Sequence, residues 1–225
     1  MKAIQAAGRG GYEALRLVDI PEPQPRTGQA LVRVTSAGVT PLDRTVLAGL
    51  HPSARKLPLV PGNEGAGIVI KDPSGRFPAG ERVLFFAGPG GVAQDGTFAE
   101  MTSVPSGNLA SMPGKIADEI AAGLPVAYLS SFLALRQAGF RAGQSVLATG
   151  VGGSVGNATS RWPARSARPN WCQRLEARRR SPLPLPTRDY ARSTSSTSSA
   201  RASPTGLPGS PLEASTSSLM RSVGL

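Results

Sequence analysis

The chain has 225 residues, of which 25 are lysine or arginine and 14 are acidic, and its formal net charge is +11. No apolar run approaches the roughly 18–20 residues that span a bilayer, and the N-terminus lacks the pattern of a secretion signal, so we expect neither a membrane protein nor a secreted one. A single cysteine, Cys172, excludes an intrachain disulfide. A cytoplasmic location is therefore the default expectation.

The positive charge is unevenly distributed. Residues 159–225 contain 11 arginines, no lysine and 3 acids, whereas residues 1–158 contain 14 basic and 11 acidic residues. A nearly neutral body is therefore predicted to carry a strongly basic tail, and the high isoelectric point describes that tail.

The first 110 residues read as short strands separated by Gly, Pro or Asp. This spacing predicts a compact, barrel-like β domain. One short helix interrupts it, with Thr40 as N-cap, Pro41 at the first helical position and "LDRTVLAGL" following. The predicted strands are residues 2–7, 15–20, 29–39, 65–70, 81–86 and 96–105.

The periodicity changes at Ile116. Apolar residues then recur at helical spacing, with Gly123-Leu124-Pro125 as a break between two helices. Residues 144–149, "QSVLAT", predict a short buried strand that leads into the glycine-rich "GVGGSVGNA". Helix, buried strand and glycine turn in that order predict the start of a doubly wound α/β domain, so the fold class passes from α+β to α/β.

The glycine turn is the first candidate site. Gly150, Gly153 and Gly156 are spaced three apart, and after a strand such a turn lets the backbone pass close to a pyrophosphate. The N-terminus of the following helix would add N–H groups and a positive dipole end. The alternative is a glycine-rich surface loop.

The pattern collapses after Ala158. Repeated prolines and the run "STSSTSSARAS" leave no apolar face, and such a segment buries too little apolar surface to offset the entropy of ordering it. We therefore expect disorder in residues 159–225, and neither the helix that should follow the glycine turn nor the next strand of a nucleotide-binding sheet.

Five ordered segments resemble the medium-chain dehydrogenase/reductase superfamily, and most closely its zinc-free quinone oxidoreductase branch, related to zeta-crystallin. The resemblance covers residues 1–158. It implies a GroES-like catalytic domain over residues 1–115 and an incomplete Rossmann domain over residues 116–158, before the tail. The segments are "AGVTPLDRTVLAGL" (37–50), "LPLVPGNEGAGIV" (57–69), "GERVLFF" (80–86), "GTFAEMTSVP" (96–105) and "GLPVAYLSSFLALRQAGFRAGQSVLATGVGGSVGNA" (123–158).

The resemblance also implies a function. Members of the family transfer a hydride from NADPH, bound between the two domains, to a quinone or another activated carbonyl compound, and homodimers are a family expectation. Thr40 and Asp43 would lie near the nicotinamide, where many relatives have Asn in place of this threonine. Asn63 and Glu64 would belong to the cleft wall. The pyrophosphate would be held by Gly150, Gly153, Ser154, Val155 and Gly156.

Zinc chemistry is not expected. The zinc-dependent branch has His within a "GHE" motif, whereas this chain has Gly62-Asn63-Glu64, and its first 158 residues contain no cysteine. An amide is a poor zinc ligand, and zinc sites in proteins use three or four ligands, mostly Cys and His. Without a Lewis acid, the site would depend on positioning and on hydrogen-bond donors, and the hydride chemistry would belong to the cofactor.

Three further residues have two interpretations each. His51, the only histidine, is a general acid or a solvated, stacking loop residue. Glu64 is a catalytic acid or a structural hydrogen-bonding residue beside two glycines. Tyr128 lies on an apolar helix face, which favours a core position over a ligand contact.

The tail is consistent with a shifted reading frame. If one base is lost near the codon of Thr159, residues 160–169 permit "VQMARALGAA", an amphipathic helix, and residues 213–225 permit "GGVDVVIDAVGGA", which resembles the family's next buried Rossmann strand. The shifted frame permits few residues at each position. Each original codon would consist of the last base of one printed codon and the first two bases of the next, so a TCN serine codon requires Val, Ile, Leu or Phe, and a threonine codon requires Asp, Asn, His or Tyr. On this hypothesis the chain is a truncated or inactive reductase.

Two other functions remain open at this stage. An Arg/Ser/Pro-rich tail with a net charge of +8 would bind nucleic acid by releasing counterions. Its few aromatic residues occur in no recognisable binding fold, which argues against this interpretation. The third interpretation is an inert remnant whose N-terminal domain merely persists.

Overall fold

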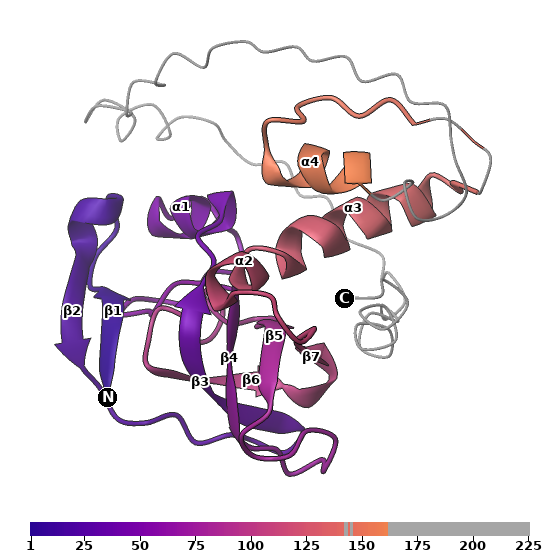
Figure 1. Cartoon of the computed structure of the whole chain (residues 1–225). Coiled ribbons are helices and arrows are strands. Elements are labelled where there is room, and N and C mark those ends of the chain that lie inside the picture. Colours follow the sequence, from indigo (N-terminus) through magenta and orange to yellow (C-terminus); the bar gives the residue numbers. More distant parts are fainter. Residues whose placement is uncertain (142–143, 145, 162–225) are drawn as a thin grey trace, which may run out of the picture.

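The structure, a computed structural model, describes residues 1–141, 144 and 146–161 (Figure 1). The expected disorder and the shifted frame concern a tail that lies almost entirely outside these residues. The elements are β1 (Lys2–Ala6), β2 (Leu15–Asp19), β3 (Gln29–Ala37), α1 (Pro41–Leu47), β4 (Glu64–Lys71), β5 (Arg82–Phe86), β6 (Met101–Pro105), β7 (Leu109–Ser111), α2 (Asp118–Ala122), α3 (Pro125–Gln137) and α4 (Ser154–Arg161), with 3-10 turns at Tyr12–Ala14 and Ser106–Asn108.

The β-rich prediction for the first 110 residues is confirmed. Each predicted strand overlaps one of the strands β1 to β6, and only the three-residue β7 was not predicted. Five strands form an antiparallel sheet in the order β6-β3-β4-β5-β7, while β1 and β2 form a separate antiparallel ribbon. The sheet is thus open between β6 and β7, and isolated bridges join the ribbon to the rest of the domain.

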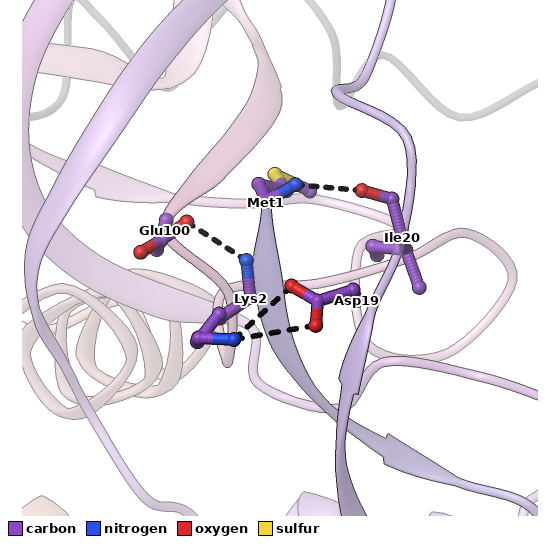
Figure 2. Close-up of polar contacts among 5 residues, drawn as sticks. All are labelled: Met1, Lys2, Asp19, Ile20 and Glu100. Carbon is purple, nitrogen blue, oxygen red and sulfur yellow. Dashed lines mark hydrogen bonds and ion pairs between the residues drawn. The ribbon is translucent and has the colours of Figure 1, made fainter.

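The N-terminal ribbon is fixed by polar contacts at its open end (Figure 2). The ammonium group of Met1 donates to the carbonyl oxygen of Ile20 at 2.8 Å, and Lys2 Nζ lies 3.2 Å from Asp19 Oδ1. The backbone N–H of Lys2 also donates to Glu100 Oε2 at 2.8 Å. Because Glu100 directly precedes β6, this bond connects the ribbon to the sheet.

The two faces of the sheet pack differently. Alternate residues of neighbouring strands, among them Val32, Val69 and Phe85, are fully buried in the main core, as the two-residue period of a strand requires. On the other face, Ala66 and Leu84 pack against small residues of α2. Helix α2 therefore lies on the sheet, and α3 begins beside α2 and contacts β4 and β5 (Figure 1).

The predicted helix pair is confirmed, with α2 and α3 on either side of Gly123-Leu124. The strand predicted over 144–149 is wrong: residues 146–149 have no strand assignment, and Leu147 is 67% exposed. A buried parallel strand needs hydrogen-bonded neighbours on both sides. The described residues provide no such neighbours at this position.

The expectation of no helix after the glycine turn is also wrong, because α4 begins at Ser154. This helix packs along α3 and buries Ala158. Thr159 and Ser131 of α3 share a hydrogen bond of 2.8 Å between their hydroxyl oxygens. Tertiary packing of this kind stabilises a helix too short to persist alone. None of the helices in the described ranges is long and apolar enough to cross a membrane.

Candidate functional site

Thr40 and Asp43 form a buried pair at the N-terminus of α1. Asp43 Oδ2 accepts from the backbone N–H of Thr40 at 2.7 Å and from its hydroxyl at 2.9 Å. Its other oxygen, Oδ1, accepts from the backbone N–H of Gly62 at 2.9 Å. This reciprocal contact confirms Thr40 as the N-cap, and it makes Asp43 a brace between α1 and the loop before β4.

Asn63 and Glu64 stand side by side at the start of β4 and are both buried. Asn63 Oδ1 lies 3.5 Å from the hydroxyl oxygen of Thr40. Glu64 contacts α3 instead, where its Oε2 accepts from the backbone N–H of Val126 at 2.7 Å. The structure thus groups Thr40, Asp43 and Asn63 as one cluster, named here the Thr40 cluster, and directs Glu64 to a different element.

Burial dominates the electrostatics of Glu64. Removal of this carboxyl from water raises its pKa from 4.5 to about 7, although the hydrogen bond from Val126 lowers it and the charge of Asp43 raises it further. A carboxyl with this pKa exchanges protons near neutrality, as acids and bases at active sites do. Its partner, however, is a backbone N–H, and this contact supports the structural interpretation of Glu64.

Two glycines make room for this arrangement. Gly62 has φ of +93°, and a Cβ at this position would lie 2.3 Å from Thr97 Oγ1. A Cβ on Gly38 would lie 2.5 Å from Glu64 Cγ and 2.7 Å from the carbonyl oxygen of Ala122. The end of β3, the start of β4 and the end of α2 therefore meet more closely than side chains at these positions would allow.

The glycine turn has a distinct geometry. Gly150 adopts φ of +67°, and its carbonyl oxygen accepts from the N–H of Gly153 at 2.8 Å. A Cβ on Gly156 would lie only 2.4 Å from that same oxygen. The turn thus needs glycine at 150 for its backbone conformation and at 156 for the close contact between α4 and the preceding backbone.

A groove of about 480 Å³ runs beside this turn, between it and helices α2 and α3. Gly153 and Ser154, two of the predicted pyrophosphate residues, line it, whereas Gly150, Val155 and Gly156 do not. None of the four residues predicted at the catalytic centre lines it either. The full lining is Ile120, Gly123, Leu124, Ala127, Tyr128, Val151, Gly152, Gly153, Ser154, Asn157 and Arg161.

Some residues that line this groove were not predicted from the sequence. Tyr128 is half-buried and lines it, so the core position favoured for this residue is wrong. Asn157 and Arg161 follow the turn by one and two helical turns, and their spacing of four was the available signal. His51 occupies a loop, as predicted, and its Nδ1 accepts from the N–H of Ser53 at 3.2 Å.

The comparisons with known proteins agree with this fold. Residues 26–114 match the alcohol dehydrogenase GroES-like domain. Over 164 residues the chain is 34% identical to a quinone oxidoreductase of Rattus norvegicus, an alignment that covers 71% of this chain and 48% of the relative. The chain is similar to members of the medium-chain dehydrogenase/reductase superfamily. The predicted GroES-like fold and the similarity to quinone oxidoreductases are thereby confirmed.

Other members of this superfamily extend the comparison. The chain is 32% identical over 163 residues to a human synaptic vesicle membrane protein VAT-1 homolog-like, covering 71% of this chain and 38% of that protein. The crystal structure of the quinone oxidoreductase from Thermus thermophilus, solved also with NADPH, aligns with a TM-score of 0.59 at 33% identity, covering 71% of this chain and 48% of that one. The chain thus spans about half or less of the length of these relatives.

Proposed function

We propose that the chain is an oxidoreductase of the quinone oxidoreductase type, which transfers a hydride from NADPH to a quinone or a related activated carbonyl compound. The observation that carries the proposal is the close-packed glycine turn of residues 150–156, which opens α4 beside a groove of about 480 Å³. This volume falls within the range of small-molecule sites. The similarity to quinone oxidoreductases supports the class of substrate.

The residues present fit a dinucleotide phosphate. The first turn of an α-helix leaves backbone N–H groups without intrahelical partners, so Ser154 and Val155 begin α4 with donors and a positive dipole end. Gly152 and Gly153 line the groove without side chains, so a pyrophosphate would come close to the backbone at these two positions. We assign the phosphate contacts to these residues. When bound there, NADPH would supply the hydride.

The Thr40 cluster would shape the nicotinamide end. Thr40 is only 8% exposed, and both oxygens of Asp43 already accept hydrogen bonds from Thr40 and Gly62. Asp43 therefore positions other groups and is not a proton donor. We propose that Thr40 presents its hydroxyl group toward the reacting ring and that its hydrogen bond to Asp43 holds this hydroxyl in place, with Asn63 Oδ1 3.5 Å away.

The proposed chemistry is independent of zinc. Asn63 stands where the zinc-dependent branch has histidine, and an amide is a poor ligand for Zn²⁺. Among the described residues, no three His, Cys, Asp or Glu side chains come close enough together to hold a metal ion. We expect that a chelator leaves any reductase activity unchanged.

The test is direct. Purified full-length chain is mixed with NADPH, and binding is measured by cofactor fluorescence, while oxidation is followed at the absorbance of NADPH with a benzoquinone as acceptor. We expect saturable binding and quinone-dependent oxidation. The same assays are repeated on a chain encoded by the restored reading frame. They distinguish two explanations for an inactive printed chain: loss of the original C-terminal sequence, or an error in the proposed function. Absence of both signals in a well-folded restored chain would refute the proposal.

A further inference from the structure

The glycine turn and the Thr40 cluster belong to different parts of the chain. Polar contacts at the junction between these parts include the pair of Arg82 in β5 with Asp118 in α2, and a contact from Glu64 that reaches α3. Glu64 lies at the start of β4, directly after Asn63, and its carboxyl group accepts from the backbone N–H of Val126 in the first turn of α3. The two residues are 62 positions apart. The contact therefore joins the domain that contains the Thr40 cluster to the helix that precedes the glycine turn.

The surrounding packing gives this contact its importance. Ala121 and Ala122 of α2 cluster with Ala66 and Leu84 of the sheet, and Leu129 of α3 packs against this cluster. The hydrophobic contribution of this packing is non-directional, so it does not by itself specify one exact placement of a helix. A hydrogen bond to a charged or polarised carboxyl group is directional and adds that specificity.

Gly38 leaves room for the carboxyl group of Glu64. Any Cβ on Gly38 would collide with Glu64 Cγ at 2.5 Å and with Glu64 Oε1 at 2.6 Å. The backbone of Glu64 is fixed as well, because its carbonyl oxygen accepts from the N–H of Gly38 at 3.0 Å and from Thr97 Oγ1 at 3.1 Å. The side chain is thus held at both ends.

The position of α3 is transmitted to the glycine turn. Helix α4 packs along α3, and the hydroxyl groups of Ser131 and Thr159 share a hydrogen bond of 2.8 Å. The groove beside the turn is itself lined by residues of α2 and α3 together with residues 151–154. Any shift at the start of α3 therefore changes the groove.

We propose that Glu64 is a positioning residue, which fixes the glycine turn relative to the Thr40 cluster by holding the first turn of α3 against the sheet. The proposal rests on the proposed function, because only a ligand that binds at both the glycine turn and the Thr40 cluster would bind more weakly when α3 shifts. Glu64 touches neither the groove nor the hydroxyl group of Thr40. Its effect on the reaction is therefore indirect.

The experiment compares Glu64→Met with Glu64→Gln in the full chain. Methionine keeps the length of the side chain but removes the strong acceptor, whereas glutamine retains an acceptor oxygen. Hydrogen exchange of the amides of residues 126–129 should become about tenfold faster in the methionine variant, in line with the loss of one hydrogen bond to a carboxyl group. The glutamine variant should restore slow exchange. Glu119→Met, an exposed glutamate on α2, is the matched control and should change nothing.

Nucleotide binding provides the second measurement. NADPH reaches from the glycine turn to the nicotinamide end, whereas ADP-ribose contains the pyrophosphate but no nicotinamide. We expect Glu64→Met to weaken NADPH binding about tenfold while the affinity for ADP-ribose stays the same. A merely structural role would weaken both ligands alike.

Each outcome decides one of the two proposals. Unchanged exchange at residues 126–129 in Glu64→Met, or equal weakening of both ligands, overturns the positioning role. If neither the wild-type chain nor the chain with the restored reading frame binds either nucleotide, the proposed function fails, and the exchange measurement alone decides whether Glu64 holds α3.

Discussion

Glu64→Gln should flatten the pH dependence of stability. Burial raises the pKa of this carboxyl from 4.5 to about 7, so the folded chain binds its proton more tightly than the unfolded chain does. The free energy of unfolding therefore falls as the pH rises through this interval, and it levels off above the folded-state pKa. Glutamine has no proton to lose in this range, and its amide oxygen still accepts from the N–H of Val126.

The size of the effect follows from the shift. One pKa unit corresponds to about 1.4 kcal/mol, so a shift from 4.5 to about 7 corresponds to about 3 kcal/mol. Glu64 is only 4% exposed, so solvent screening reduces this value little. The free energy of unfolding of the glutamine variant minus that of wild type should therefore be about 3 kcal/mol larger at pH 7.5 than at pH 4.5.

Urea denaturation, followed by circular dichroism at four pH values between 4.5 and 7.5, measures this difference. Two other carboxyl groups do not interfere. Burial of Asp72 is outweighed by its hydrogen bonds from Ser106, Ser74 and Phe77, which lower its pKa below 3.8, and hydrogen bonds from Thr35 and Arg82 lower the pKa of Asp118. Both therefore titrate on the acid side of the interval, in wild type and variant alike.

Glu119→Gln serves as the control, because it makes the same chemical change at an exposed site. It measures the effect of the amide substitution itself, which is subtracted from the result for Glu64→Gln. If the difference between Glu64→Gln and wild type were constant from pH 4.5 to 7.5, the buried carboxyl would not titrate as argued.

Three further predictions concern the cluster, the turn and the reading frame. Thr40→Val removes the hydroxyl that donates to Asp43 and should cost about 1–2 kcal/mol in urea denaturation, whereas Thr40→Ser should cost less; equal losses would count against the bond. Gly156→Ala should abolish NADPH binding in a fluorescence titration, because the added Cβ would meet the carbonyl oxygen of Gly150 at 2.4 Å, whereas Gly114→Ala, with open space around it and no place in the groove, should bind as wild type does. Sequencing of the gene between codons 155 and 165 should reveal a lost base. Peptides from the cell that match the printed tail would exclude a lost base.

The strands and the first helix were predictable because their signals are local. Runs bounded by Gly, Pro and Asp marked the strands, and Thr40 followed by Pro41 marked the start of α1. The apolar run at 144–149 misled because a strand also depends on its neighbours in the sheet. Only three residues long, β7 was too short to show a two-residue period.

The site was predictable only as a set of residues. The resemblance predicted Thr40, Asp43, Asn63 and Glu64 around one cleft, and the structure brings the first three together. The contact between Glu64 and Val126 joins residues 62 positions apart, and no spacing rule relates them. The role of Gly38 depends on where that carboxyl group lies, so it too required the structure.

The order of elements along the chain also governs how the protein is made. The last strand of the sheet ends at Ser111, whereas the helices that cover Ala66 and Leu84 begin only at Asp118. During translation the sheet is therefore completed while one of its apolar faces is still bare. Nascent chains with such surfaces are prone to aggregation, and we expect chaperones to engage this face until α2 and α3 emerge from the ribosome.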